Sequence, residues 1–392
     1  MSSGRTWASP GSPSPIHGSL IASQHESSGL YVDPTDFPTP HPLPIESISP
    51  SLANDLLACQ LRVAFSRDPE LRSWRRPSTY SALGVAAHWV TEKAFKRSHW
   101  PTDAVQVRNR LVELWDGEIE RGASALANAW APAIPPPPNE WPGYSLTRAR
   151  TIRRAVKLLT SRSAGSGDRI PGTGIEIELT DAESGLSGRA DRIDRDGSAT
   201  RIVDLKTGLR QGAPTDDQRR QLLLYAVLAQ RATGAWPSSI AVEDASGFQY
   251  VQELSAPQAE DVLQEVESAR SEFNTLTSTA RFTEVAQPSA DRCRWCAFRV
   301  VCRPYWQELR ADWQHRSVMG RIVETGFADG TGHLSISIES PADQSNRIVH
   351  LSSASMAPSE ADDKAAIVDW MGNLELGTVR ARWSTSLRTW RA

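Results

Sequence analysis

The stretch GRADRIDRDGSATRIVDLKTGLRQGAPTDDQRRQLLLY, residues Gly188–Tyr225, decides the fold of this chain. A predicted strand, Leu186–Asp194, leads into it and continues to Asp196-Gly197, a dipeptide that accepts the positive φ of a tight hairpin turn. A second predicted strand, Arg201–Lys206, follows directly. The stretch therefore predicts a β-hairpin within a small sheet.

The charged side chains of this hairpin suit chemistry on a phosphate. Alternate side chains of a strand point to opposite faces, so Asp204 and Lys206 share one face, while Val203 and Leu205 share the other. The hairpin brings Asp191 toward Asp204. Two carboxylates suit Mg²⁺ or Mn²⁺, and a lysine beside them can orient or deprotonate water or stabilise charge on the phosphate. A bare Asp-x-Lys is more often a surface ion pair, so the context decides.

That context includes a helix downstream. Gln221 and Tyr225 lie one helical turn apart in a pattern whose apolar surface comes from Leu222, Leu223, Leu224 and Val227. Gly188-x-x-Asp191, Asp204-x-Lys206 and Gln221-x-x-x-Tyr225 together resemble the motifs of the RecB-like branch of the PD-(D/E)XK nuclease superfamily. The resemblance covers roughly residues 52–306. It implies an α/β fold like that of restriction endonucleases, a central mixed sheet flanked by helices.

The resemblance also implies a site. That branch has a histidine in a G-x-x-x-H pattern upstream, which Gly84 and His88 match, although a lone helical histidine is more often a core residue. Asp204 stands where many relatives have Glu, and either carboxylate can bind a metal ion. Lys206 would position the attacking water, and Gln221 and Tyr225 would orient the substrate strand or the lysine. The implied metal ligands are His88, Asp191, Asp204 and the carbonyl of Leu205.

The four cysteines form a second pattern. Cys59 stands alone, and Cys293, Cys296 and Cys302 lie close together, which is not the dense spacing of a secreted disulfide framework. Four thiolates can hold a [4Fe–4S] cluster or a structural Zn²⁺. The arrangement resembles the iron–sulfur nucleases of the AddB type and of CRISPR adaptation, which favours [4Fe–4S]. In this interpretation the cluster is a structural staple that nearby aromatic side chains shield: Trp295, Phe298, Tyr305, Trp306 and Trp313.

Composition divides the rest of the chain. Residues 1–45 are rich in Ser, Pro, Gly and His and predict a disordered or loosely attached tail. Residues 46–314 form the predicted nuclease domain, with a helical insertion at about 90–170 that includes the polyproline connector Ala131–Pro142. No apolar run is long enough to span a membrane. We expect a cytoplasmic protein with reduced cysteines.

Positive charge is clustered although the formal net charge is −3. Residues 60–110 contain ten Lys and Arg against four Asp and Glu, and residues 143–171 contain seven against one. Such clusters can follow a phosphate backbone, and a solvated helix face explains them as well. In the predicted strand Thr173–Leu179, Glu176 and Glu178 share a face. One of them can reach the metal region, but an exposed polar face explains both equally well.

Residues 315–392 differ in composition. Predicted strands at Val318–Thr325, His333–Ile338 and Arg347–Leu351, then a helix at Asp362–Met371 and two further strands, give the order of an OB-like β-barrel. Short strands of this kind also fit other small barrels.

These patterns predict a Mg²⁺- or Mn²⁺-dependent deoxyribonuclease, an exonuclease on single-stranded or end-containing DNA, in DNA repair, recombination or phage defence. The alternative is an inactive nucleic-acid-binding or scaffold subunit of a helicase–nuclease complex. No G-x-x-x-x-G-K-[ST] loop occurs in the sequence, so unwinding requires a helicase partner.

Overall fold

A computed structural model describes residues 33–391, except 97–98, 132, 164–173, 197–198, 207–212, 245, 314–315, 329–330, 340–345, 354–361, 370 and 374–377. The predicted turn residue Gly197 and most of the predicted tail therefore lie outside the described residues. None of the helices in the described part is both long and apolar enough to cross a membrane.

A mixed five-stranded sheet forms the centre of the protein, as predicted. Its order is β1-β2-β3-β4-β5, with β3 and β4 parallel and the other neighbours antiparallel. The strands are β1 (Gly174–Asp181), β2 (Leu186–Asp196), β3 (Ala199–Leu205), β4 (Ser239–Glu243) and β5 (Gln249–Glu253). The predicted hairpin strands are confirmed as β2 and β3.

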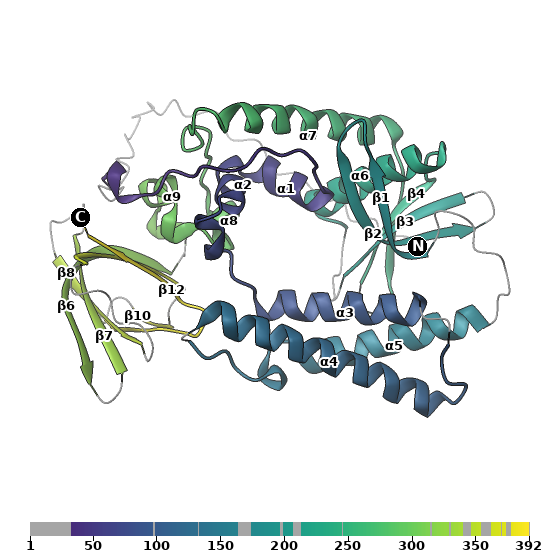
Figure 1. Cartoon of the computed structure of the whole chain (residues 1–392), viewed down its shortest axis with the longest axis horizontal. Helices are drawn as coiled ribbons and strands as arrows, with labels where there is room; N and C mark the ends of the chain where they lie inside the picture. The colour runs from purple at the N-terminus through teal and green to yellow at the C-terminus, as the bar shows by residue number, and fades with distance from the viewer. Residues whose placement is uncertain are drawn as a thin grey trace, which may run out of the picture.

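Helices pack on this sheet and build its main core. The helix α6 carries the predicted Gln221 and Tyr225, and its residues from Leu222 to Ala229 are buried. It begins at a capping box in which Thr215 and Gln218 exchange hydrogen bonds. Figure 1 shows α7 lying along the outside of α6, with α1 and α2 beside them. These helices are α1 (Pro50–Ala58), α2 (Gln60–Arg67), α6 (Asp216–Thr233) and α7 (Ala256–Leu276).

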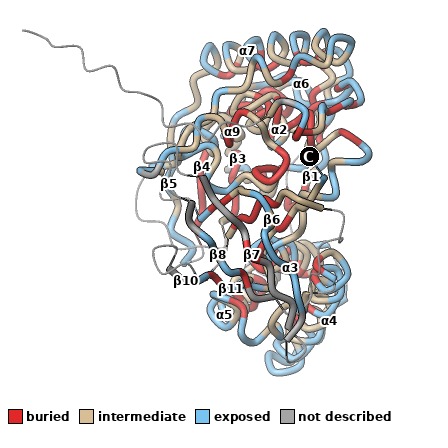
Figure 2. The backbone as a smooth tube through the Cα atoms, turned by 90° about the vertical axis from the view of Figure 1, so that its left-hand side faces the viewer, coloured by how far each residue is buried: buried red, intermediate tan, exposed pale blue. Residues whose placement is uncertain are grey.

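A second layer of three long helices lies on the side of the molecule opposite α7 (Figure 1). It consists of α3 (Thr79–Lys96), α4 (Ala104–Trp130) and α5 (Tyr144–Ser163). These helices bury a separate core around Leu111 and Trp115. The helical insertion predicted at about 90–170 overlaps α4, α5 and the end of α3. The outward faces of α4, α5 and α7 are largely exposed in Figure 2, while buried residues concentrate between the layers.

The cysteine-containing segment follows α7 and packs on the main core. Phe298, Tyr305 and Trp306 are buried there, whereas Trp295 is 80% exposed. The expectation that all five aromatic residues shield the cysteines is therefore wrong for Trp295. The segment includes α8 (Ala290–Arg294) and α9 (Arg303–Glu308), and the short 3-10 helices of the chain are Pro34–Asp36, Leu71–Trp74, Pro138–Glu140, Arg299–Val301 and Ala311–Trp313.

The C-terminal strands form an open sheet in the described residues, and no closed OB-like barrel is seen. The order is β10-β11-β8-β7-β6-β9-β12. The strands are β6 (Ser317–Ala328), β7 (Thr331–Glu339), β8 (Asn346–Ser353), β9 (Lys364–Val368), β10 (Met371–Asn373), β11 (Thr378–Arg380) and β12 (Ser386–Trp390).

The helix predicted at Asp362–Met371 is wrong, because β9 lies there, between β6 and β12. All four residues of Ala365–Val368 are buried, since a central strand is covered on both faces. Such a short, continuous apolar run does not alternate, and by periodicity alone it cannot be distinguished from a buried helix.

The segment before α1 joins the two sheets. Asp36 is 8% exposed and accepts hydrogen bonds from Lys364 at 2.9 Å and from the Trp390 indole at 3.2 Å, so it contacts both β9 and β12. Ile45 and Ile48 are buried in the main core. The part of the predicted tail from Asp33 onward is thus held against the protein.

Candidate metal centre and active site

The site lies where β2 and β3 separate. The ladder between these strands runs from Asp196 to Arg192, which pairs with Val203. One residue further along β2, the backbone pairing ends. There the side chain of Asp191 bonds to β3 instead, because its Oδ2 accepts a 2.6 Å hydrogen bond from the backbone N–H of Leu205. Asp191 is thus fixed at the opening between the two strands, next to Asp204.

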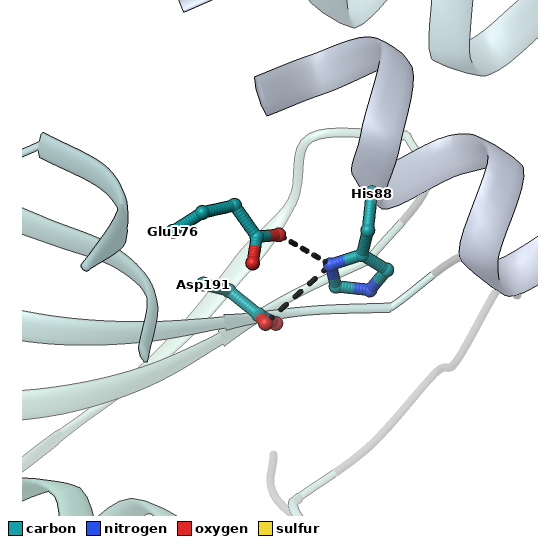
Figure 3. A group of neighbouring side chains, drawn as sticks. All are labelled: His88, Glu176 and Asp191. Carbon is teal, nitrogen blue, oxygen red and sulfur yellow. Dashed lines mark hydrogen bonds and ion pairs between the residues drawn. The ribbon is translucent and has the colours of Figure 1, made fainter. Parts of the chain in front are cut away.

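Three possible metal ligands meet at this opening. His88 Nδ1 lies 2.9 Å from Glu176 Oε1 and 3.4 Å from Asp191 Oδ1, as Figure 3 shows. The three ligand atoms all lie within 4.8 Å of one another. Among the described residues this is the one such group of His, Cys, Asp and Glu. The helix α3 supplies the histidine, β1 the glutamate and β2 the aspartate.

Glu176 is held in an unusual backbone conformation. Its φ is +52°, a region that few non-glycine residues adopt and that often marks functional sites. The side chain is 3% exposed, and its second oxygen lies 2.9 Å from Arg189. Glu178, two residues along β1, is exposed. The sequence offered both glutamates as candidates and could not choose between them. Of the two, the structure brings only Glu176 into the group.

We expect Glu176→Gln to weaken Mn²⁺ binding by roughly 10- to 100-fold, because it removes a buried charge that contacts His88. Glu178→Gln is the matched control and should bind Mn²⁺ like the wild type. Isothermal titration calorimetry on the metal-free protein measures both. Equal affinities of the two variants would contradict a ligand role for Glu176.

Asp204 and Lys206 share a face, as predicted. Lys206 Nζ donates a 3.0 Å hydrogen bond to Asp204 Oδ1 and lies 2.8 Å from Oδ2. Oδ2 is buried, and the Lys206 ammonium is the cation beside it. Among the described residues, His88, Glu176 and Asp191 form the group within 4.8 Å, so the structure places the predicted ligand Asp204 outside that group and against Lys206. One imidazole and two carboxylates are donors that suit Mg²⁺ or Mn²⁺.

The motif residues Gly188 and Tyr225 are in direct contact. A Cβ on Gly188 would lie 3.0 Å from the Tyr225 ring and 2.9 Å from Pro50 Cδ. The Tyr225 hydroxyl interacts with Gln221. Burial, with a further contribution from the Asp191 charge, raises the pKa of Tyr225 to about 12, so the hydroxyl remains a hydrogen-bond donor beside the carboxylates.

Gly188→Ala should lower the free energy of unfolding by about 1–3 kcal/mol, because the added methyl group displaces Tyr225 or Pro50. Gly84, in the motif that precedes His88, is the matched comparison, since a Cβ added there would meet nothing within 4 Å. Gly84→Ala should be neutral or stabilising by up to about 1 kcal/mol, as expected for a helix interior. Urea unfolding of both variants tests this. If Gly188→Ala were as stable as Gly84→Ala, the close packing against Tyr225 would be disproved.

Protonation of the site depends on its charges. Burial raises the pKa of Asp191 from 3.8 to about 6; His88 opposes this shift and the Asp204 charge increases it. Burial lowers the pKa of His88, but the hydrogen bond with Glu176 and the charges of Asp191 and Glu176 outweigh burial and raise it above 6.5.

Both pKa values are higher in the folded protein than in the unfolded chain, so folding binds protons. The metal-free protein should therefore lose stability as the pH rises through about 6 for Asp191 and through the raised pKa of His88. A bound cation favours the deprotonated site, so Mn²⁺ should raise the melting temperature more at about pH 8 than at about pH 5. Thermal unfolding with EDTA or Mn²⁺ measures this difference, and an equal increment at both pH values would contradict it.

An arginine of the helical layer supports the strand ends behind the site. Arg154 of α5 donates a 2.8 Å hydrogen bond to the Asp244 carbonyl and lies 3.3 Å from Glu243. The backbone N–H of Lys206 in turn donates to the Glu243 carbonyl at 2.8 Å. Arg154 therefore links α5 to the segment that holds Lys206, a contact that the sequence did not reveal.

The four cysteines line one small cavity between the start of α2 and the segment after α7. All four are free thiols. Burial raises the pKa of Cys296 to about 11 and raises that of Cys302 as well. Among the described residues, the four sulfur atoms form no group comparable to that of His88, Glu176 and Asp191.

The fold and the site define the class. A histidine and acidic side chains meet beside an Asp-x-Lys pair at the opening of a mixed sheet, which is an arrangement for metal-assisted phosphodiester hydrolysis. The family model of the PD-(D/E)XK nuclease superfamily matches residues 47–303. The chain belongs to this superfamily, whose members are typically nucleases that use divalent metal ions and bind DNA. No curated protein matches the sequence.

Proposed function

We propose that this protein is a metal-dependent deoxyribonuclease that acts as an exonuclease on single-stranded or end-containing DNA. The observation that carries the proposal is the group of His88, Glu176 and Asp191 within 4.8 Å, beside the 2.8 Å ion pair of Asp204 and Lys206. His88, Asp191, Asp204 and Lys206 belong to the motifs that resemble the superfamily, Glu176 is added by the structure, and together they come from four separate parts of the chain.

In this proposal His88, Glu176, Asp191 and Asp204 hold Mg²⁺ or Mn²⁺, and the Leu205 carbonyl stays a predicted further ligand. A bound ion would polarise the phosphate and lower the pKa of a water molecule. Lys206 orients the attacking water and stabilises negative charge that develops on the phosphate. Tyr225, kept protonated and hydrogen-bonded to Gln221, orients the substrate strand or the lysine.

We further propose that the four cysteines hold a [4Fe–4S] cluster with a structural role. A single Zn²⁺ with Zn–S bonds of about 2.3 Å would bring the four sulfur atoms to about 3.8 Å from one another. The four sulfur atoms line one cavity, which supports a shared metal centre. The preference for iron–sulfur over zinc rests on the resemblance of the cysteine arrangement to the iron–sulfur nucleases.

The test of nuclease function is cleavage of end-labelled single-stranded DNA by the wild type and by Asp204→Ala. Cleavage by the wild type with Mg²⁺ or Mn²⁺, its loss with EDTA and its loss in Asp204→Ala are the expected results. Equal cleavage by both proteins would indicate a contaminant and would support the alternative, an inactive nucleic-acid-binding or scaffold subunit of a helicase–nuclease complex. The proposed setting is DNA repair, recombination or phage defence, with a helicase as the proposed partner.

A further inference from the structure

A cavity of about 520 Å³ lies between α4 and α5, outside the candidate active site. Its lining runs along α5 from Tyr144 to Val156 and along α4 from Ala104 to Val112. At 1.5 Å per helical residue, the α5 side is about 18 Å long. The cavity is thus an elongated groove, and we refer to it as the α4–α5 groove.

The groove is positively charged. Arg108 of α4 and Arg148 and Arg153 of α5 line it. Arg148 lies 3.5 Å from Asp116, whereas within the described part of the chain no acidic side chain forms an ion pair with Arg108 or Arg153. The helix α5 as a whole contains six Lys and Arg and no Asp or Glu. Two guanidinium groups are therefore available to an anionic ligand.

The floor of the groove is apolar. Ile152 and Val156 of α5, Val112 of α4 and Tyr144 also line it, and the Tyr144 ring centroid lies 6.1 Å from that of Trp115. Phosphate groups alone would contact only the arginines of the groove. A ligand that also covers the apolar side chains must present flat apolar groups. The bases of an unpaired strand can do so, whereas the bases of a duplex are stacked inside it.

The groove is one helix away from the catalytic strand. Arg153 lines the groove, and its neighbour Arg154 contacts Glu243 and Asp244 at the strand ends behind Lys206. An α-helix with its side chains is about 10–12 Å across. The helix α5 therefore both lines the groove and contacts the strand ends beside Lys206.

We propose that the α4–α5 groove binds single-stranded DNA, with phosphates on Arg108 and Arg153 and bases on Tyr144 and the apolar side chains. Its length of about 18 Å accommodates a few nucleotides. The inference rests on the proposed function for the identity of the strand, and it adds a binding site that is separate from the metal centre.

The test is fluorescence anisotropy of a labelled oligothymidine with the full chain in EDTA, which prevents cleavage. Arg108→Ala with Arg153→Ala should weaken binding by about tenfold or more and reduce the slope of log K against log salt by about 1.4, the value for two phosphates on a single strand. Tyr144→Ala should weaken single-strand binding by about fivefold or more and leave duplex binding unchanged.

The matched control is Arg110→Ala with Arg121→Ala. Both arginines lie on α4, pair with Glu113 and Glu118, and do not line the groove. This control should bind the oligonucleotide like the wild type. Equal weakening by the two double variants, or equal affinity of the wild type for duplex and single strand, would overturn the groove as a single-strand site.

Cleavage assays separate this inference from the nuclease proposal. The groove variant should raise KM for a long oligonucleotide and leave kcat and the cleavage of a tetranucleotide unchanged, because so short a strand cannot span both sites. If the wild type cuts no DNA but binding still depends on Arg108 and Arg153, the groove stands and the nuclease proposal fails. If the wild type cuts DNA and the groove variant binds normally, the groove alone is disproved.

Discussion

Lys206→Ala is expected to reduce metal-dependent cleavage of single-stranded DNA by about 10²- to 10⁴-fold, because it removes the group that positions the water and stabilises charge on the phosphate. Metal binding should survive this change. Lys206 is a cation 2.8 Å from Asp204 Oδ2, so its removal frees a buried carboxylate, and Mn²⁺ should bind at least as tightly as to the wild type. Lys206→Ala thereby differs from Glu176→Gln, which should lose affinity for the ion.

The assay is single-turnover cleavage of an end-labelled strand at saturating Mn²⁺, paired with calorimetric titration of the ion. Lys93→Ala serves as the control, since Lys93 lies on α3 near the site and contacts the Trp89 ring. It should cut at the wild-type rate. Full activity of Lys206→Ala, or loss of Mn²⁺ binding along with activity, would remove Lys206 from its proposed catalytic role.

The sequence predicted the parts of the site that lie within local motifs. The spacing in Asp204-x-Lys206 fixes a shared strand face, and the 2.8 Å ion pair confirms it. The Asp191 position follows from the hairpin. The contact of Gly188 with Tyr225 gives a physical reason for a glycine in one motif and an aromatic ring in another, although nothing in either motif alone indicates that they meet.

The sequence could not assign Glu176, because its place depends on tertiary structure. Its φ of +52° and the approach of His88 from α3 are set by how a distant helix crosses the end of β1. The available signal was an acidic residue within the predicted strand Thr173–Leu179, shortly before the motif aspartate in the chain. The support of the strand ends by Arg154 was likewise beyond sequence patterns, since α5 and β4 are far apart in the chain.

The C-terminal sheet shows a different limit. Most strands were predicted, but β9 was taken for a helix, and the closed barrel followed from that error. The chain buries Asp36 against Lys364 and Trp390 and pairs Arg299 with Asp369 at 2.6 Å. The sheet is thus joined to the nuclease domain through the N-terminal segment and through the cysteine-containing segment, so the cysteines lie at a junction of three parts of the fold.

That position predicts a large effect for Cys302→Ser. If the four thiols hold a [4Fe–4S] cluster, the anaerobically purified wild type should be brown and contain about four iron atoms per chain, and Cys302→Ser should be colourless. Binding of the cluster is then part of the folding free energy. The variant should lose several kcal/mol of stability, or about 10 °C or more in melting temperature, because Cys59 at the start of α2 is no longer tied to the segment after α7.

Trp295→Ala is the matched control for this experiment. Trp295 lies between Cys293 and Cys296 in sequence, but it is 80% exposed, so its loss should alter neither colour nor stability. Iron analysis, visible absorption and thermal unfolding of the three proteins distinguish the outcomes. Stoichiometric zinc without iron in the wild type would show that the four thiols hold a structural Zn²⁺ instead of a cluster. A Cys302→Ser variant as stable as the wild type would show that the cysteine cavity holds no structural metal at all.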